Sequence, residues 1–129
     1  MCESIFVIDD NIDNRKLTEI LLEFEGFDVR VAEDAEQALD VLRHYRPNLI
    51  LMDVQMPGMD GLELTRHLRQ DPSLNGVIIV ALSAYAMASE KENARAAGCD
   101  GYITKPINTR TFGNVVRQYL GLPPPAPAR

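Results

Sequence analysis

The sequence lacks tryptophan, and aromatic residues make up only 6% of its 129 residues. A core built from this chain must therefore be mostly aliphatic. No apolar run approaches the ~20 residues that a membrane-spanning helix needs, so we expect no membrane segment. The first residues, MCESIFVIDD, carry neither a basic stretch nor a cleavage pattern of the kind found in signal peptides. We therefore expect a cytoplasmic protein.

Basic residues and cysteines are also scarce. Thirteen lysines and arginines stand against 19 aspartates and glutamates, which gives a formal net charge of −6. No basic stripe stands out, and this argues against a general nucleic-acid binder. The two cysteines, Cys2 and Cys99, form neither a disulfide framework nor the spacing of a metal site, so we expect free thiols. The length and the 46% hydrophobic content suit one domain with a single core.

The most informative stretch is NLILMDVQMPGMDG, residues 48–61. Its apolar residues run without interruption into Asp53, which is typical of a strand buried on both faces of a parallel sheet. The proline and glycines that follow favour a loop. A carboxylate at the carboxyl end of a central strand lies where open α/β sheets bind their ligands. From this stretch alone, Asp53 could equally start a turn or cap a helix.

Strand and helix patterns alternate along the chain. Short apolar or alternating segments predict further strands at residues 5–8, 29–31, 77–82 and 102–103. Apolar residues at helical spacing predict a first helix with Leu17, Ile20, Leu21 and Phe24 on one face, stopped by Gly26. Helical spacing and turn residues predict four more helices, around residues 35–42, 61–70, 88–97 and 112–119.

Five strand–helix alternations imply parallel strands, right-handed crossovers and helices on both faces of one sheet. We therefore expect a doubly wound α/β domain over residues 1–121, followed by a proline-rich tail or linker stump at 122–129. The helix at 88–97 has an inward face of alanine, so we expect it to pack lightly and to move easily. Asp60 is expected to cap the helix that follows it rather than to act as an acid catalyst.

Parallel strands bring their carboxyl ends to one edge of the sheet, where polar residues follow four of the five predicted strands. They are Asp9 and Asp10, Asp53, Ser83 and Lys105. Three crowded carboxylates repel one another, and a hard divalent cation such as Mg²⁺ relieves that repulsion. A hydroxyl and an ammonium beside such a centre are what phosphoryl transfer to an aspartate needs. Lys105 could also be only a structural counter-ion.

Four motifs in this order, each at a predicted strand end, resemble the receiver domains of two-component signalling: Asp9-Asp10, Asp53 with the following MPGMDG, Ser83-Ala84 and Lys105-Pro106. The resemblance runs from about residue 5 to residue 120. It implies the CheY-like (flavodoxin-like) fold, a five-stranded parallel sheet in the order 2-1-3-4-5 with five helices. It also implies a response regulator that is not an enzyme for outside substrates, catalysing only its own phosphorylation and dephosphorylation.

The resemblance assigns roles to the polar residues. Asp53 would accept a phosphoryl group from a histidine kinase or a phosphotransfer protein. Asp10 and Asp53 would bind Mg²⁺ (Mn²⁺ is possible) directly, with the backbone carbonyl of Gln55 as a third ligand. Asp9 would act on the metal directly or through a water. Lys105 would contact the phosphoryl oxygens.

The switch is implied by the same resemblance. Ser83 would hydrogen-bond the phosphoryl group and move inward, and Tyr102 would follow. The Lys105–Pro106 bond would be cis, an uncommon state even for proline. Gln55 and Tyr85 occupy variable positions near the acceptor, and we expect them to crowd the approach of water and slow dephosphorylation.

The partner surface and two alternatives remain open at this point. A downstream protein would bind the face of the fourth helix, fifth strand and fifth helix, and the chain would be a monomer or a weak homodimer. Residues 83–105 resemble both hybrid-kinase receivers and stand-alone regulators of the DivK type. A metal-dependent phosphohydrolase would place its first two acids one residue apart, whereas Asp9 and Asp10 are adjacent, and it would need a cap domain. A binding module without phosphate would be favoured if an acid or Lys105 were missing.

Overall fold

The computed structural model describes residues 3–56 and 58–122. Strands and helices alternate along the chain, with one added 3₁₀ turn that the sequence pattern did not predict. In chain order they are β1 (Ser4–Ile8), α1 (Ile12–Phe24), β2 (Asp28–Ala32), α2 (Ala35–Leu42), β3 (Leu49–Asp53), α3 (Gly61–Arg69), the 3₁₀ turn η1 (Pro72–Leu74), β4 (Ile78–Ser83), α4 (Ala88–Ala97), β5 (Gly101–Thr104) and α5 (Phe112–Tyr119).

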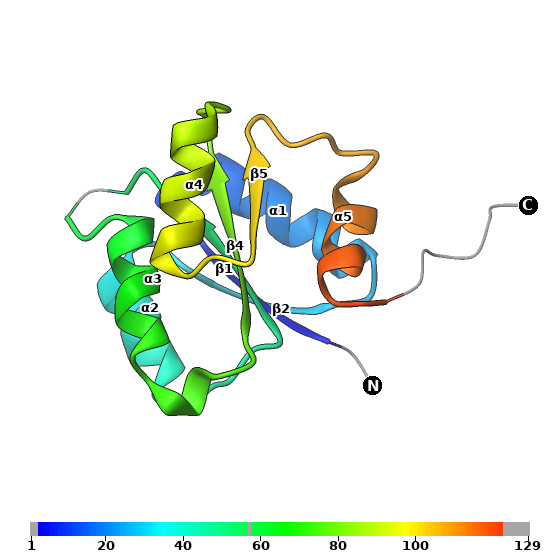
Figure 1. The fold of residues 1–129 in the computed structure, drawn as a ribbon. Coiled ribbons are helices and arrows are strands. Elements are labelled where there is room, and N and C mark those ends of the chain that lie inside the picture. Colours follow the sequence, from blue (N-terminus) through cyan, green and yellow to red (C-terminus); the bar gives the residue numbers. More distant parts are fainter. Residues whose placement is uncertain (1–2, 57, 123–129) are drawn as a thin grey trace, which may run out of the picture.

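All strand pairs are parallel, and the sheet order is β2-β1-β3-β4-β5. In Figure 1 the neighbouring arrows of β4 and β5 point the same way. The register aligns Ile8 of β1 with Met52 of β3, and Asp53 of β3 with Leu82 of β4. These pairings bring the carboxyl ends of the central strands to the same edge. The predicted doubly wound α/β fold, with its strand order and five helices, is confirmed.

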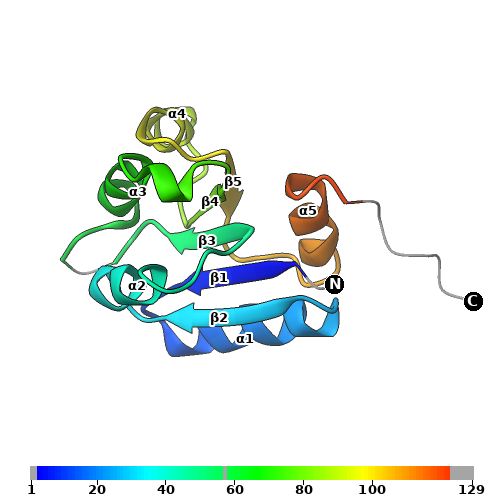
Figure 2. The same ribbon diagram turned by 90° about the horizontal axis from the view of Figure 1, so that it is seen from below.

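Helices cover both faces of the sheet (Figure 2). Side chains alternate across a strand, so β3 sends Leu49 and Leu51 to one side and Ile50 and Met52 to the other. The first pair packs with α1 and α5, and the second with α2, α3 and α4. As expected from the composition, the core is largely aliphatic, and every residue of β3 is buried.

Side-chain caps set the start of several helices. Asp60 accepts a hydrogen bond from the backbone N–H of Glu63 at 2.9 Å, which is the predicted N-cap of α3. Asp34 caps α2 in the same way, accepting from Gln37 N–H at 2.8 Å. Such caps satisfy backbone donors that have no partner within the helix. The helical pattern therefore begins where the sequence predicts it.

The apolar face predicted for α1 packs only in part, because Leu21 packs against the core while the rest of the stripe is exposed. Ile20 is 62% exposed and Phe24 is 88% exposed, whereas Thr18 and Leu22 are the buried residues of this helix. Periodicity identifies the helix, but it does not say which apolar stripe meets the core. Leu22 and Thr18 lie on the buried side of α1 with Leu21 beside them, and the rest of the predicted stripe faces solvent.

Other predictions have mixed outcomes. The inward face of α4 is alanine, since Ala94 and Ala97 are its buried residues. The predicted tail at 122–129 and Cys2 lie outside the described residues, apart from Leu122. None of the described helices has the length and hydropathy that crossing a membrane requires.

Candidate functional site

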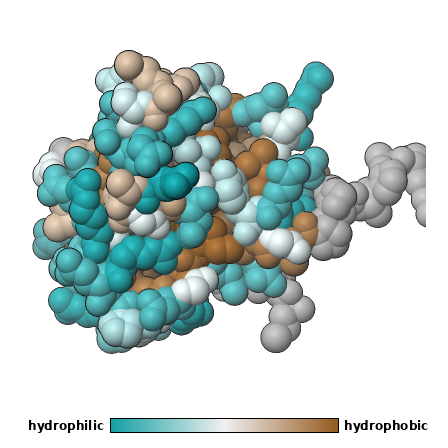
Figure 3. All heavy atoms as spheres, viewed as in Figure 1, coloured by the Kyte–Doolittle hydropathy of each residue, from teal (hydrophilic) through white to brown (hydrophobic). Residues whose placement is uncertain are grey.

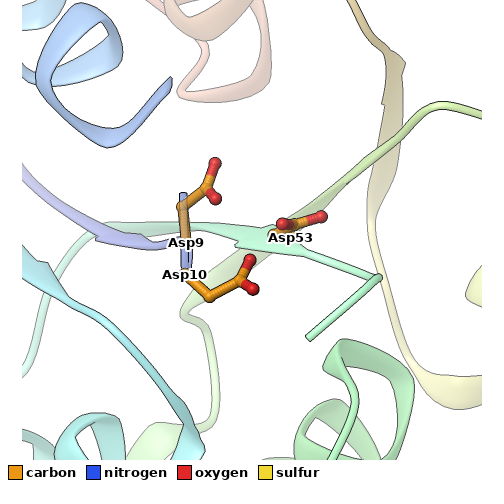
Figure 4. A group of neighbouring side chains, drawn as sticks. All are labelled: Asp9, Asp10 and Asp53. Carbon is orange, nitrogen blue, oxygen red and sulfur yellow. The ribbon is translucent and has the colours of Figure 1, made fainter. Parts of the chain in front are cut away.

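Three carboxylates meet where β1 and β3 end (Figure 4). Asp53 is the last residue of β3 and Asp9 follows β1, and both are buried. Asp10 is exposed. One oxygen from each of the three side chains lies within 4.8 Å of the others. The fold thus brings together the acids predicted from the strand ends.

Lys105 supplies a cation to this cluster from the segment after β5. Its Nζ lies 3.2 Å from Asp53 Oδ1 and 3.5 Å from Asp9 Oδ2, and its side chain is 18% exposed. The Lys105 backbone N–H donates to the carbonyl of Ser83 at 2.7 Å, which extends the pairing of β4 and β5. The Lys105–Pro106 peptide bond is cis.

The charges in this pocket are not balanced. Burial raises the pKa of Asp53 from 3.8 to about 7, Lys105 opposes that rise, and the Asp9 carboxylate adds to it. A carboxyl group in this state is held back from ionising by desolvation and by its acidic neighbour. A further cation at the pocket would favour its ionised form. Clustered carboxylate oxygens are the donor set that Mg²⁺ prefers, so the residues fit such an ion.

The loop after β3 folds back on the strand end. Asp53 Oδ1 accepts a hydrogen bond from the Gln55 N–H at 3.2 Å, and Gly61 N–H donates to the Val54 carbonyl at 3.1 Å. A Cβ at Gly61 would collide with the backbone carbonyl of Asp53 and approach Val54 Cα to 2.9 Å. Glycine is therefore required here by close backbone approach. The sequence marks Gly61 as a breaker, but this steric reason is visible only in the structure.

Ser83 ends β4 and is fully buried. Its Oγ accepts from the Tyr85 N–H at 3.1 Å, and the amide Nε2 of Gln55 lies 3.2 Å away. The Tyr102 hydroxyl donates to the backbone carbonyl of Tyr85. The residues named as the switch are thus connected through Tyr85, although Ser83 and Tyr102 do not bond to each other.

Sequence reasoning missed Arg15 and the hydrogen bonds of the Gln55 side chain. Arg15 Nη1 donates to the Asp9 carbonyl at 2.9 Å, and its Nη2 lies 3.5 Å from Glu33. This guanidinium fixes the turn that presents Asp9. In the sequence, an arginine on a helix is only a weak signal of such a role, because exposed helix faces carry many basic residues.

A cavity of about 310 Å³ opens beside Asp9 and Lys105. Its walls come from the start of α1, the end of β4 and the segment after β5, and its apolar lining includes Leu17, Leu82 and Ile107. It was not predicted, because its residues come from separate elements with no shared motif.

Comparisons with known proteins agree with this geometry. The family model described as a response regulator receiver domain matches residues 5–117. The polar-differentiation response regulator DivK of Brucella anthropi is 39% identical over 121 residues, covering 94% of this chain and 98% of that protein. DivK of Brucella ovis is 38% identical over the same length and coverage.

Solved structures agree as well. The chemotaxis protein CheY4 of Vibrio cholerae superposes with a TM-score of 0.88 at 26% identity, covering 92% of this chain and 99% of that one. The receiver domain of the sensor histidine kinase PA1611 of Pseudomonas aeruginosa, solved with a magnesium ion in its active-site cleft, has a TM-score of 0.84 at 30% identity, covering 94% and 99%.

These matches give no support to a phosphohydrolase or to a binding module without phosphate. The family model covers most of the chain, and relatives more than 30% identical match it almost end to end. The acids, the lysine and the hydroxyl meet at the carboxyl edge of a sheet with the matching strand order. This chain therefore belongs to the response regulator receiver domain family of two-component signalling.

Proposed function

We propose that Asp53 is the phosphoacceptor of this receiver domain, and that it takes the phosphoryl group from a histidine kinase or a phosphotransfer protein. The single observation that carries this proposal is the placement of the Asp53 carboxylate. It lies at a strand end, 3.2 Å from the Lys105 ammonium and within the cluster formed with Asp9 and Asp10. A nucleophilic carboxylate needs this kind of electrostatic setting.

The metal site proposed here uses Asp9, Asp10 and Asp53 together with the backbone carbonyl of Gln55, and Mg²⁺ is the preferred ion, with Mn²⁺ as a substitute. The oxygen cluster supports this assignment. The magnesium-bound PA1611 receiver domain supports it by similarity. When bound, the ion would neutralise charge on the phosphoryl oxygens.

The chemical step follows from these positions. A carboxylate oxygen of Asp53 attacks the phosphorus of a phosphohistidine, an O–P bond forms while the N–P bond breaks, and the imidazole leaves with the electron pair. Lys105 is close enough to Asp53 to stabilise charge on the incoming phosphoryl group. The phosphoryl group ends on the chain's own Asp53, so we propose that the chain catalyses only its own phosphorylation and dephosphorylation and is not an enzyme for outside substrates.

Switching would run from Ser83 to Tyr102. A phosphoryl group adds about two negative charges and three acceptor oxygens, which would recruit the Ser83 hydroxyl. The Tyr85 backbone contacts Ser83 through its N–H and Tyr102 through its carbonyl, so a shift of Ser83 would be passed on. Moving a population from mostly off to mostly on requires states that differ by about 5 kcal/mol in their affinity for the phosphoryl group.

The output surface proposed here is the face of α4, β5 and α5. Every residue of β5 is half-buried rather than buried, so this edge of the sheet is only partly covered. Figure 3 shows hydrophobic residues between the edge strand β5 and helix α5 on the side of the molecule that faces the viewer. A partly covered apolar face beside a lightly packed helix suits a partner whose binding depends on the switch.

The phosphodonor, in contrast, would contact α1. This helix starts next to Asp10, and its exposed apolar residues include Ile12 (53% exposed), Ile20 and Phe24. A donor protein must lie over the mouth of the pocket to reach Asp53, and the cavity lined by Leu17 adjoins that mouth. Exposed apolar patches of this kind mark protein-binding sites.

We also propose the boundaries of the unit, with the receiver domain at residues 1–121 and a tail or linker at 122–129. The packing of α5 on the core through Phe112 and Val116 supports a domain end soon after this helix. Limited proteolysis should leave a fragment that ends near Gly121.

Intact mass tests the phosphoacceptor after incubation with Mg²⁺ and a small acyl-phosphate donor. We expect one added phosphoryl group on the wild type. Neither Asp53→Asn nor a wild-type sample with EDTA should gain it. An adduct that persists in Asp53→Asn would place the phosphate elsewhere and contradict the proposal.

A further inference from the structure

The side chain of Gln55 turns back into the site although the residue is exposed. Its Nε2 lies 3.2 Å from Ser83 Oγ, and its Oε1 lies 3.5 Å from both Ser83 Oγ and the backbone N of Ala84. An exposed glutamine side chain without contacts samples several rotamers. We therefore attribute the rotamer of Gln55 to the polar groups that it contacts. The amide therefore spans the end of β4 from the loop after β3.

Ser83 has one proton to give. Its oxygen accepts from the Tyr85 N–H at 3.1 Å and faces the amide nitrogen of Gln55, so the amide oxygen of Gln55 is the acceptor that its O–H meets. The Ala84 N–H meets the same oxygen. One amide oxygen thus faces two neighbouring donors at the edge of the pocket.

A phosphoryl group presents only acceptor oxygens, so it can bind these groups only through the Ser83 O–H and the Ala84 N–H. A hydroxyl proton points to one acceptor at a time. The Tyr85 contact can persist, because there the Ser83 oxygen accepts. The contacts with Gln55 Oε1 cannot persist together with a phosphoryl oxygen in the same place.

We propose that the Gln55 side chain is an internal competitor for the phosphoryl group: its amide oxygen occupies the Ser83 and Ala84 donors, and it must be displaced for the phosphorylated state to form. This inference rests on the proposed function of Asp53. Gln55 is a positioning residue in this account, because it acts through Ser83 and Ala84. It differs from the crowding role expected from the sequence, which depends on bulk and not on the amide.

The test measures the affinity of beryllofluoride in the presence of saturating Mg²⁺, since this anion stands in for the phosphoryl group on Asp53. Gln55→Met keeps the length of the side chain and removes the amide, while Gln55→Ala removes both. Loss of the competing hydrogen bonds should tighten binding by about three- to tenfold in both variants. Backbone amide NMR follows the titration and also reports the Ala84 N–H directly, which should shift in both variants before any anion is added.

A second comparison uses the Ser83→Ala background. Because one of the two contested donors is then absent, the gain from Gln55→Met should shrink, and this coupling between the positions would not arise from a general loosening of the loop. Unchanged or weaker binding by Gln55→Met would overturn the proposal, as would tighter binding by Gln55→Ala alone, which is the signature of crowding. A wild type that binds no beryllofluoride with Mg²⁺ would instead overturn the proposed function and this inference with it.

Discussion

The two ends of the sheet each hold a cation paired with carboxylates, but the cation at the amino ends pairs with one carboxylate and the cation at the carboxyl ends with two. At the amino ends of β4 and β5, Arg69 donates to the carbonyls of Gly98 and Val77 at 2.9 Å and pairs with Asp100 at 2.6 Å. Asp100 in turn accepts from the Ile79 N–H at 2.9 Å. Each charged group in this cluster has partners of the opposite kind.

At the carboxyl ends, Lys105 is the one cation among the described residues that pairs with Asp9 and Asp53, and Asp10 lies close by. Burial raises the pKa of Asp53, the Asp9 carboxylate adds to that rise, and Lys105 opposes it. We interpret the balanced end as a contributor to stability, and the unbalanced end as one that gives up stability for the proposed metal and phosphoryl group.

Among the changes at the two ends of the sheet, the largest effect on stability should come from Gly61→Ala. The new Cβ would collide with the Asp53 carbonyl, so the loop or the strand end must move. We expect a loss of about 2–3 kcal/mol in the free energy of unfolding, measured by urea denaturation, with slower phosphorylation by a small donor.

Gly58→Ala is the matched control, because Gly58 has a φ of +74° but nothing within 4 Å of the added Cβ. It should cost only about 1 kcal/mol through backbone strain and leave phosphorylation unchanged. Equal effects of the two changes would show that the close approach at Gly61 is unimportant.

The balanced end is tested next by Arg69→Ala. Two backbone carbonyls and Asp100 would lose their donor, and we expect a loss of about 1–2 kcal/mol, discounted because the side chain is 26% exposed. Phosphorylation by a small donor should proceed at the wild-type rate. A phosphorylation defect as large as the stability defect would mean that the two ends are not separable.

At the carboxyl ends, removing a charged side chain should raise the free energy of unfolding, whereas at the amino ends it should lower it. Asp53→Asn removes a buried carboxylate whose pKa is raised from 3.8 to about 7. A carboxyl with a raised folded-state pKa makes the metal-free protein lose stability as pH rises between these two values. At pH 8 without metal, Asp53→Asn should therefore be more stable than the wild type by about 1–2 kcal/mol.

The difference between Asp53→Asn and the wild type should shrink toward pH 4, where the carboxyl is protonated in both the folded and the unfolded protein. Urea titrations at several pH values in EDTA measure this. A variant that is less stable than the wild type at pH 8 would refute the account of the carboxyl end.

The smallest effect on stability is expected away from both ends, at Phe24. Because this side chain is 88% exposed, Phe24→Ser should change the free energy of unfolding by less than about 0.5 kcal/mol. Leu22→Ala on the same helix removes a fully buried side chain and should cost about 2–4 kcal/mol.

Phosphorylation of Phe24→Ser by a small donor should match the wild type. Transfer from a histidine-phosphorylated donor protein should slow by about five- to tenfold, because an apolar contact residue is lost. Unchanged protein-to-protein transfer would remove α1 from the proposed donor surface.

Much of this structure could be predicted from the sequence because parallel strands leave strong local signals. The continuous apolar run before Asp53 and the capping residue Asp60 define their elements without tertiary information. The meeting of Asp9, Asp53 and Lys105 follows from topology alone, since parallel strands share their carboxyl edge.

What could not be predicted depends on packing between distant segments. The solvent-facing stripe of α1 has the same periodicity as a buried one, so only the structure distinguishes Phe24 from Leu22. The contact of the Gln55 amide with Ser83 joins two loops with no shared pattern. The need for glycine at position 61 arises from a backbone approach that composition does not record.

The most direct test of the central claim is to identify the residue that carries the phosphate. Borohydride reduces an aspartyl phosphate to homoserine, and peptide mapping after phosphorylation with Mg²⁺ and a small acyl phosphate locates that residue. The account predicts homoserine at position 53 alone, and none when Mg²⁺ is removed. Homoserine at Asp9 or Asp10, with Asp53 intact, would contradict it.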